Sequence, residues 1–287
     1  MKRDRKQAVL ITVYKDYEQV KRLIEKLSGC YIYVHVDKKS KQLFCDLTNE
    51  YKGEEHVIVV SKFKVTWGSY NHLQAVMCLM KLAIQNSSVK YVHVISGQDY
   101  PIVDEERFAE FDNCEKVFMT CKCLNETDDG VASRYDLLHP FASLLDIRSK
   151  HYKRVDKRFR CHRARIGRFK VGDLFKGMIW ASMPMTVCKY VCEFVNTISG
   201  RLFHFGLRFS EIPEEVFFQT ILMHSKYRDF VVKDNLRFTL WQVKNGSFPG
   251  VLDESDYEAI RNSNAVFARK IDSVYSLNLI ERIDNVR

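Results

Sequence analysis

Two adjacent carboxylates, Glu214 and Glu215, directly follow Pro213 in the stretch 208–223. Proline is favoured in the first turn of a helix, where its missing N–H leaves no hydrogen bond unmade, so we expect a helix to begin at Pro213. The helix dipole favours negative charge in this turn. A glutamate held ionised there is suited to accept a proton as a general base. The other interpretation is that both glutamates only cap the helix.

Apolar residues in the predicted helix lie four positions apart, Phe217 with Ile221 and Phe218 with Leu222. Side chains at this spacing share one helix face. We therefore expect a buried helix with the two glutamates at its mouth.

Several common catalytic signatures are missing from the 287 residues. There is no G-x-G-x-x-G or G-x-x-x-x-G-K-[ST] run, so a dinucleotide site or a P-loop has no anchor. There is also no G-x-S-x-G elbow of a hydrolase and no H-E-x-x-H zinc motif. No Asp-x-Asp pair follows a predicted strand, which argues against a divalent ion held against a diphosphate.

Positive charge is concentrated in residues 148–170, which hold eleven Lys/Arg residues and one acid, Asp156. This stretch alone accounts for the net charge of +9. Such a run attracts nucleic acid, anionic lipid or a phosphorylated substrate, or it forms a solvated loop and helix face.

The nine cysteines are scattered and lack the paired spacing of a structural zinc site. We expect free thiols and a reducing, cytosolic compartment. The apolar run at 8–14 is short and has no cleavage site after it, so it is interpreted as a first strand and not as a signal peptide. No apolar run approaches the roughly 18 residues that span a membrane.

Short apolar strands alternate with helix-like segments from residue 8 to residue 95. We predict strands at 8–14, 30–36, 56–60 and 91–95, and helices at 16–27, 41–51 and 69–84. This alternation favours a parallel sheet with helices on both faces, in which ligands bind at the carboxyl ends of the strands. Asp37 and the turn at 96–101 directly follow strands, so polar chemistry is expected at that edge.

The rest of the chain is less regular. We predict a strand at 117–121, a long excursion at 148–170, a strand at 176–182, a helix at 185–195, a loop at 243–250, a helix at 257–262, a strand at 265–268 and a last helix from Asp272. No Pro/Gly-rich linker or internal repeat divides the chain, so a single domain over 1–287 is expected.

Seven short motifs occur in a fixed order. They are IYVHVDKKS (32–40), TWGS (66–69), SGQDYPI (96–102), GMIW (177–180), PEEVFFQT (213–220), NLRFTLW (235–241) and VFARK (266–270). In this order they resemble the glycosyltransferase family that contains the core-2/I-branching β-1,6-N-acetylglucosaminyltransferases and the peptide O-xylosyltransferases. The last two motifs lean towards the xylosyltransferase branch.

The resemblance implies a GT-A type α/β fold, with a Rossmann-like mixed sheet flanked by helices. Residues 1–105 would form the nucleotide-binding half, and 106–287 the acceptor and catalytic half. The implied reaction moves xylose or N-acetylglucosamine from a UDP-sugar co-substrate, with inversion, to a hydroxyl of a saccharide, glycolipid or protein acceptor. No metal and no other cofactor is expected.

The resemblance also assigns the two sides of the reaction. Glu215 matches the catalytic base, and Arg269 with Lys270 matches the phosphate-binding pair. Without a metal, the charge of the departing diphosphate must be met by fixed cations. The alternative for Arg269 and Lys270 is ordinary surface charge.

Four further residues would contact the nucleotide. By the same resemblance Asp37 contacts the uracil or ribose, and Thr12, Thr66 and Trp67 line the pocket. The alternative for Asp37 is a simple turn at the end of a strand.

The sugars would meet aromatic residues. Trp180 is expected beside the donor sugar and Ser247 near the diphosphate. Trp241 matches a position that stacks on the acceptor sugar, where an aromatic face suits the sugar C–H groups, and a core tryptophan is an equally good alternative. Asp99 is interpreted as structural, because it sets the turn before Pro101.

Two departures from the family bear on partners and location. Its eukaryotic members carry a membrane anchor and disulfides that the sequence does not show, which favours a cytosolic bacterial enzyme, peripheral on the inner face of a membrane, that builds a polysaccharide or glycolipid. Ile179 stands before Trp180 where the xylosyltransferases carry an acid, which leaves the sugar open.

The basic stretch 148–170 would draw such an enzyme to anionic lipid or a lipid-linked acceptor. A rival function is nucleic-acid binding by the same stretch with His151, Tyr152 and Phe159, but no recognisable module supports it, so no nucleic-acid partner is expected. A third possibility is an inactive relative that only binds nucleotide or glycan, against which Glu215 argues.

Overall fold

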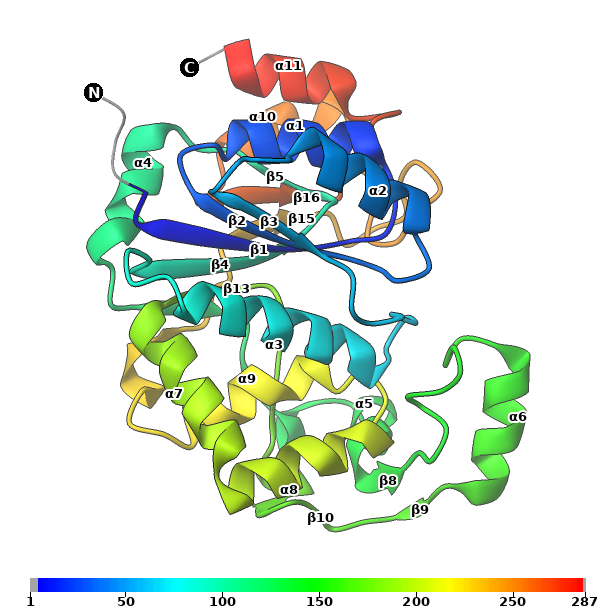
Figure 1. Cartoon of the computed structure of the whole chain (residues 1–287). Helices are drawn as coiled ribbons and strands as arrows, with labels where there is room; N and C mark the ends of the chain where they lie inside the picture. Colours follow the sequence, from blue (N-terminus) through cyan, green and yellow to red (C-terminus); the bar gives the residue numbers. More distant parts are fainter. Residues whose placement is uncertain (1–4, 286–287) are drawn as a thin grey trace.

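A sheet of seven strands runs through the centre of the computed structural model, which describes residues 5–285 (Figure 1). Its order is β14 (Val231–Val232), β6 (Val117–Met119), β13 (Ala181–Pro184), β4 (Tyr91–Ser96), β1 (Gln7–Val13), β2 (Tyr31–Val36) and β3 (Val57–Val60). Strands β4, β1, β2 and β3 are parallel to their neighbours in this set. Strand β13 runs antiparallel to β4 and to β6, so the sheet is mixed, as predicted.

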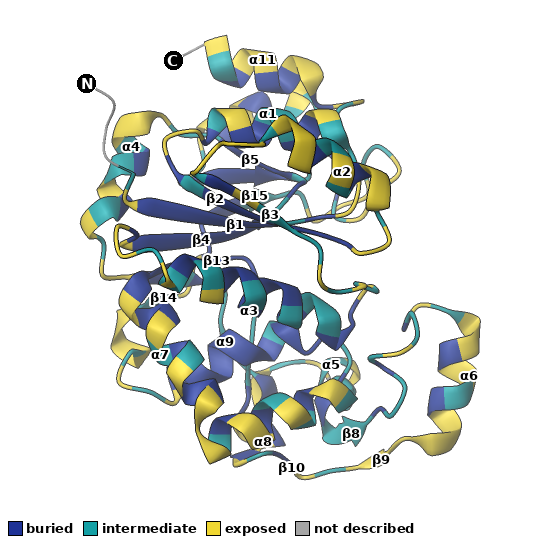
Figure 2. Cartoon of the chain, in the orientation of Figure 1, coloured by how far each residue is buried: buried dark blue, intermediate teal, exposed yellow. Residues whose placement is uncertain are grey.

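Helices cover both faces of this sheet because side chains alternate along its buried strands. In β1, Ala8 and Leu10 pack into one apolar cluster, and Val9 and Ile11 pack into the other. The first cluster is completed by α3 (Tyr70–Ile84), α7 (Met185–Asn196), α8 (Ile198–Gly206) and α9 (Glu214–Met223). The second is completed by α1 (Tyr17–Lys26), α2 (Lys41–Glu50), α10 (Tyr257–Arg261) and α11 (Leu277–Asn285). Figure 2 shows the sheet as a buried layer between these groups.

Smaller sheets and helices complete the fold. A three-stranded sheet has the order β15 (Arg237–Thr239), β16 (Phe267–Arg269) and β5 (Asp99–Pro101). The other helices are α4 (Glu105–Ala109), α5 (Asp129–Asp136) and α6 (Lys150–Phe159). Two-stranded ribbons pair β7 (Lys122–Cys123) with β12 (Phe175–Lys176), β8 (Leu137–Leu138) with β9 (Cys161–His162), and β10 (Arg165–Ile166) with β11 (Phe169–Lys170).

The seven elements predicted between residues 8 and 95 are all present, with each end within one residue of the prediction. Two later predictions are wrong. The strand expected at 176–182 is divided between β12 and β13, because the backbone N–H of Gly177 donates to the carbonyl of Glu215 and that of Met178 to Thr120 Oγ1. The last helix begins at Leu277 and not at Asp272, because Asp272 Oδ1 accepts backbone N–H bonds in a turn of its own.

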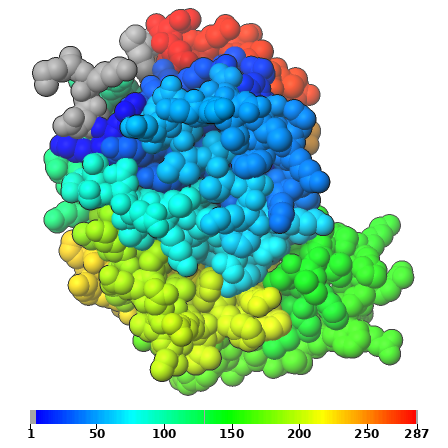
Figure 3. All heavy atoms as spheres, in the orientation of Figure 1, coloured from blue at the N-terminus to red at the C-terminus, as the bar shows by residue number. Residues whose placement is uncertain are grey.

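The basic stretch 148–170 is more ordered than the predicted excursion, since α6 and three short strands form within it. Helix α6 begins after Ser149, whose hydroxyl accepts from the backbone N–H of Tyr152. The region drawn in green that contains α6 lies at one end of the molecule (Figure 3). No helix among residues 5–285 combines the length and apolar character needed to cross a bilayer.

Candidate active site

Most of the predicted site residues lie at one edge of the sheets. Thr12 is near the carboxyl end of β1, and Asp37 directly follows β2. Trp180 immediately precedes β13, which runs antiparallel to β4, so it lies where β4 ends. Arg269 pairs with Asp99 across β16 and β5, just beyond the end of β4. The edge predicted to carry polar chemistry therefore collects residues from five strands.

Helix α9 meets this edge with its first turn. Pro213 is the N-cap and the helix begins at Glu214, one position after the predicted start. Each residue of α9 is buried except Glu215. The helix is therefore buried on nearly all sides, and not only on the one face that the apolar spacing predicted. Glu215 is the one side chain of α9 that reaches the surface.

Glu215 is held between two cations. Its Oε2 lies 2.9 Å from Lys176 Nζ and 3.8 Å from a guanidinium nitrogen of Arg134, and the side chain keeps 25% of its surface exposed. Burial raises the pKa of Glu215, and the ammonium of Lys176 partly offsets that rise. A carboxylate that stays ionised but has a raised affinity for a proton has the properties of a general base.

Glu214 faces the other way and joins a chain of polar contacts. Its Oε1 lies 3.1 Å from His72 Nδ1, and His72 Nε2 lies 3.3 Å from Thr12 Oγ1. A neutral imidazole with its proton on Nδ1 satisfies both contacts, since the Thr12 hydroxyl can donate to Nε2. The His72 ring also packs edge-on against Trp180, with 5.7 Å between ring centroids. The buried Glu214 therefore links α9 to α3 and β1.

Arg269 is a buried cation with few partners. Its side chain is 8% exposed, and its guanidinium lies 4.5 Å from the centroid of the Trp180 ring. Nε is 3.9 Å from Asp99 Oδ1, too far for a hydrogen bond. Among the described residues, neither Nε nor Nη1 has a hydrogen-bond acceptor. Burial lowers the pKa of Arg269. Unsatisfied buried donors on a cation favour binding of an anion.

Asp99 fixes the turn next to this cation. Its Oδ2 accepts from the backbone N–H of Ser96 at 2.8 Å and from the Ser96 hydroxyl at 2.5 Å. These contacts agree with the structural interpretation, and Oδ1 additionally faces Arg269.

Lys270, the neighbour of Arg269, contacts the turn that contains Ser247 and Phe248. Its Nζ lies 3.1 Å from Ser247 Oγ and 3.3 Å from the carbonyl of Phe248. Burial and the neighbouring Arg269 both lower the pKa of Lys270. The rings of Trp241 and Phe248 are 6.1 Å apart, and each is more than half exposed. Trp241 is therefore a surface residue beside Phe248, not part of the core.

The remaining nucleotide candidates lie where the chain enters α3. Asp37 Oδ1 accepts from the backbone N–H of Lys39 at 3.0 Å and of Val65 at 3.2 Å. It thus ties the end of β2 to the segment that carries Thr66 and Trp67. The Trp67 ring is half exposed, and the Arg148 guanidinium lies 5.2 Å from its centroid.

Three residues of this arrangement were missed by the sequence analysis: His72, Lys176 and Arg134. His72 and Lys176 each adjoin a motif, since His72 is in the first turn of the helix that TWGS opens and Lys176 directly precedes GMIW. Their positions beside motif residues are a usable signal. Arg134 has no such signal.

Comparisons with known proteins agree with the motif pattern. The family model of the Core-2/I-Branching enzyme matches residues 8–261. A xylosyltransferase of Ciona intestinalis is 22% identical over 300 residues, which covers 96% of this chain and 33% of the relative. Xylosyltransferase 2 of Mus musculus is 23% identical over 299 residues, covering 96% and 33%. The chain thus spans about a third of the length of these relatives.

A solved structure, HddC from Yersinia pseudotuberculosis, aligns with 40% of this chain and 57% of its own at 16% identity and a TM-score of 0.28. The family match covers most of the chain, contains six of the seven motifs in full and includes the start of α9. The mixed sheet flanked by helices is consistent with a GT-A type fold. The chain belongs to the Core-2/I-Branching enzyme family.

Proposed function

We propose that this chain is an inverting glycosyltransferase that moves a sugar from a UDP-sugar to an acceptor hydroxyl without a catalytic metal. Glu215 takes the proton of the hydroxyl as its oxygen attacks the anomeric carbon. The bond from that carbon to the diphosphate breaks, and UDP leaves with the electron pair. The family assignment supports a glycosyltransferase, while donor, stereochemistry and metal independence are part of the proposal.

The observation that carries the proposal is the buried, unsatisfied guanidinium of Arg269 beside Lys270. A cation about 4 Å from a phosphate oxygen contributes roughly 4 kcal/mol of attraction at an effective dielectric of about 20, before desolvation is subtracted. Two such cations stabilise a diphosphate most when charge accumulates on it in the transition state. Ser247, which is hydrogen-bonded to Lys270, would donate to the same group.

The other predicted residues fit this scheme by position. Thr12, Asp37, Thr66 and Trp67 flank the start of α3 and would bind the nucleotide, with Asp37 acting through the segment that it holds. Trp180, against Arg269, would border the donor sugar. The exposed Trp241 ring would stack on an acceptor sugar.

The similarity to xylosyltransferases favours xylose as the sugar, with N-acetylglucosamine as the alternative. A saccharide, glycolipid or protein would be the acceptor.

Basic residues of α6 support one further partner, an anionic membrane surface. Lys153, Arg154, Lys157 and Arg158 are exposed on one helix, and Phe159 beside them is 54% exposed. Cations with an exposed aromatic ring are typical of peripheral contact with anionic lipid. By contrast, Arg163 of the same basic stretch is structural, because its guanidinium donates to two backbone carbonyls and to Ser210.

Nucleotide binding tests the donor site. In thermal-shift and calorimetric titrations, UDP should bind more tightly than GDP or CDP, and EDTA should leave the UDP affinity unchanged. The double variant Arg269→Ala, Lys270→Ala should weaken UDP binding by roughly 10²–10⁴-fold, since each charged hydrogen bond contributes about 1.5–3 kcal/mol.

Lys189→Ala, which removes an exposed lysine from α7, is the matched control and should bind UDP like the native chain. Equal affinity for the three nucleotides, or UDP binding that requires a divalent ion, would contradict the proposal.

A further inference from the structure

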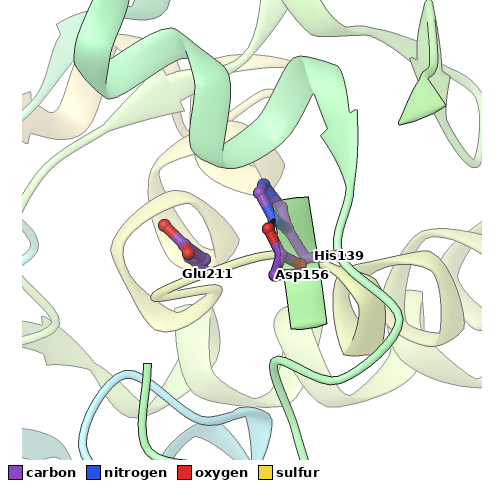
Figure 4. Close-up of side chains that lie close together, drawn as sticks. All are labelled: His139, Asp156 and Glu211. Carbon is purple, nitrogen blue, oxygen red and sulfur yellow. Dashed lines mark hydrogen bonds and ion pairs between the residues drawn. The ribbon is translucent and has the colours of Figure 1, made fainter. Parts of the chain in front are cut away.

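Three potential metal ligands that the proposed transfer does not use lie together (Figure 4). They are His139, which follows β8, Asp156 of α6, and Glu211, two residues before Pro213. One donor atom from each lies within 4.8 Å of the other two. His139 and Asp156 are buried, and Glu211 is half-buried. Three separate segments therefore converge on one point.

The orientation of the imidazole is fixed by a backbone group. His139 Nε2 lies 2.9 Å from the carbonyl oxygen of Ser133. Because a carbonyl only accepts, Nε2 must carry the proton, and in the neutral ring Nδ1 then bears a lone pair. Nδ1 lies 2.9 Å from Asp156 Oδ2. Two lone pairs at this separation require a cation between them or a second proton on the ring.

The negative charge of Asp156 and Glu211 is not balanced by the single imidazole. Asp156 is 3% exposed, and among the described residues its Oδ1 has no hydrogen-bond partner. The Tyr152 hydroxyl lies 2.8 Å from Glu211 Oε1 and 3.4 Å from His139 Nδ1, and its one proton is donated to Glu211. No lysine or arginine in residues 5–285 forms an ion pair with Asp156 or Glu211, although α6 is rich in both. One imidazole faces two carboxylates.

We propose that His139 Nδ1, Asp156 and Glu211 bind a divalent first-row transition metal, with Zn²⁺ as the best fit. Three mixed N/O ligands with a fourth position open to water are typical of zinc. Zinc–ligand lengths of about 2.0–2.1 Å place tetrahedral ligands about 3.3 Å apart. The His139–Asp156 pair is already near this spacing, and the half-buried Glu211 side chain has room to close the rest.

The outer contacts match those around metal ligands. A ligating histidine usually donates its other N–H to a carbonyl or carboxylate, as His139 does to Ser133. A ligating carboxylate is usually hydrogen-bonded in turn, as Glu211 is by Tyr152.

The ion would join α6 to the segment that leads into α9. In that segment the backbone N–H of Glu211 donates to the carbonyl of Arg134, whose guanidinium contacts Glu215. The ion touches neither Glu215 nor Arg269, so its role is structural. Metal binding here and metal-independent transfer are separate claims that are tested by separate measurements.

Zinc titration of the full-length, EDTA-dialysed chain tests the site. We expect a single Zn²⁺ to bind per chain by calorimetry and to raise the melting temperature, and Co²⁺ to give the visible absorption of a four-coordinate site. Glu211→Gln should lower zinc affinity by more than the ~10–100-fold that loss of an outer-shell partner costs, and Tyr152→Phe should lower it within that range.

Glu54→Gln is the matched control, because Glu54 pairs with His56 at 3.3 Å on the surface. This variant should bind zinc like the native chain. Asp156→Asn changes a buried ligand and is informative only if the variant folds. Glu211→Gln changes a half-buried residue, so it decides the test if Asp156→Asn does not fold. Absence of zinc binding by the native chain, or equal affinity in Glu211→Gln, would overturn the site whatever the UDP titrations show.

Discussion

Glu214 and Glu215 are neighbours in the chain, yet the fold gives them opposite surroundings. Glu214 turns into the protein, where His72 and the α3–β1 contacts use its charge. Glu215 turns outward, where Lys176 and Arg134 keep it ionised while burial raises its pKa. Glu215 combines a partly exposed side chain with a raised pKa, so its surroundings as well as its motif support the proposal that it is the base.

Removal of the Glu215 carboxylate tests that assignment. Glu215→Gln keeps the size of the side chain but cannot take a proton, so we expect turnover to fall by roughly 10²–10⁴-fold. UDP affinity should change little, because the diphosphate cations lie elsewhere. Glu193→Gln, an exposed change on α7, serves as the control. Steady-state rates with a UDP-sugar donor measure the effect, and turnover within a few-fold of native would remove Glu215 from the mechanism.

Lys176 should set the pH dependence of the reaction. Its ammonium lowers the pKa of Glu215, and burial acts in the opposite direction. The base works only when ionised, so the rate should fall as pH drops through that pKa. Lys176→Met removes the lowering charge, raises the pKa of Glu215 and should move the acid limb of kcat/KM to higher pH. Lys176→Arg keeps the charge and should leave the limb in place. An unmoved limb in Lys176→Met would mean that the two groups are not coupled.

At the scale of elements, residues 177–180 link β12 to β13 and connect the neighbour of Glu215 with the neighbour of Arg269. Lys176 directly precedes this link and Trp180 ends it. Between them Gly177 donates its N–H to the carbonyl of Glu215 at 2.8 Å. A Cβ on Gly177 would lie 1.7 Å from the carbonyl oxygen of Thr120. The close approach of these backbones, and not a turn conformation, is what requires glycine here.

Gly177→Ala should therefore destabilise the fold. Displacement of the Thr120 backbone or of the link is expected to cost about 1–3 kcal/mol, as overpacking does in other cores. Urea denaturation followed by circular dichroism measures it. Gly29→Ala is the control, since a Cβ there meets no atom within 4 Å, and it should be neutral or slightly stabilising. Equal midpoints for the two variants would show that the link has room to move.

The sequence predicted local elements better than their long-range contacts. In the strands and helices from residue 8 to residue 95, apolar residues recur at regular intervals, and these intervals can be recognised in the sequence itself. The prediction of a strand at 176–182 failed because backbone N–H groups of this region donate hydrogen bonds to Thr120 and Glu215, which are far away in the chain. Likewise, the motifs contain Glu215 and Arg269, and His72 lies close to the TWGS motif. The contacts of His72 with Glu214 and Thr12, however, require α3, α9 and β1 to meet, which local spacing does not record.

At the scale of the whole molecule, charge is distributed unevenly. In the proposed donor site Arg269 is buried and Lys270 is half-buried, whereas the cations of α6 are exposed at one end of the molecule (Figure 3). Buried cations act on a bound anion at short range, and exposed ones create a field that salt screens. The excess positive charge therefore serves two different partners in our proposal, a diphosphate and a membrane surface.

Vesicle binding separates these two uses of charge. Replacement of Lys153, Arg154, Lys157 and Arg158 by Gln leaves the buried Tyr152 and Asp156 in place. Each cation near an anionic surface contributes about 1 kcal/mol, so partition onto phosphatidylglycerol vesicles should fall by roughly 10²–10³-fold while UDP affinity is kept. The control variant removes the same charge from exposed sites away from α6, namely Lys52, Lys90, Lys116 and Lys189.

In co-sedimentation the native chain and this control should pellet with anionic vesicles at low salt and be released as salt rises, because the attraction is screened. The α6 variant should stay in the supernatant under all conditions, and none of the three should bind neutral phosphatidylcholine. Loss of binding in both four-fold variants would indicate a response to net charge alone. Equal pelleting of all three would show that α6 is a solvated face, and the membrane proposal would then be withdrawn without any effect on the donor site.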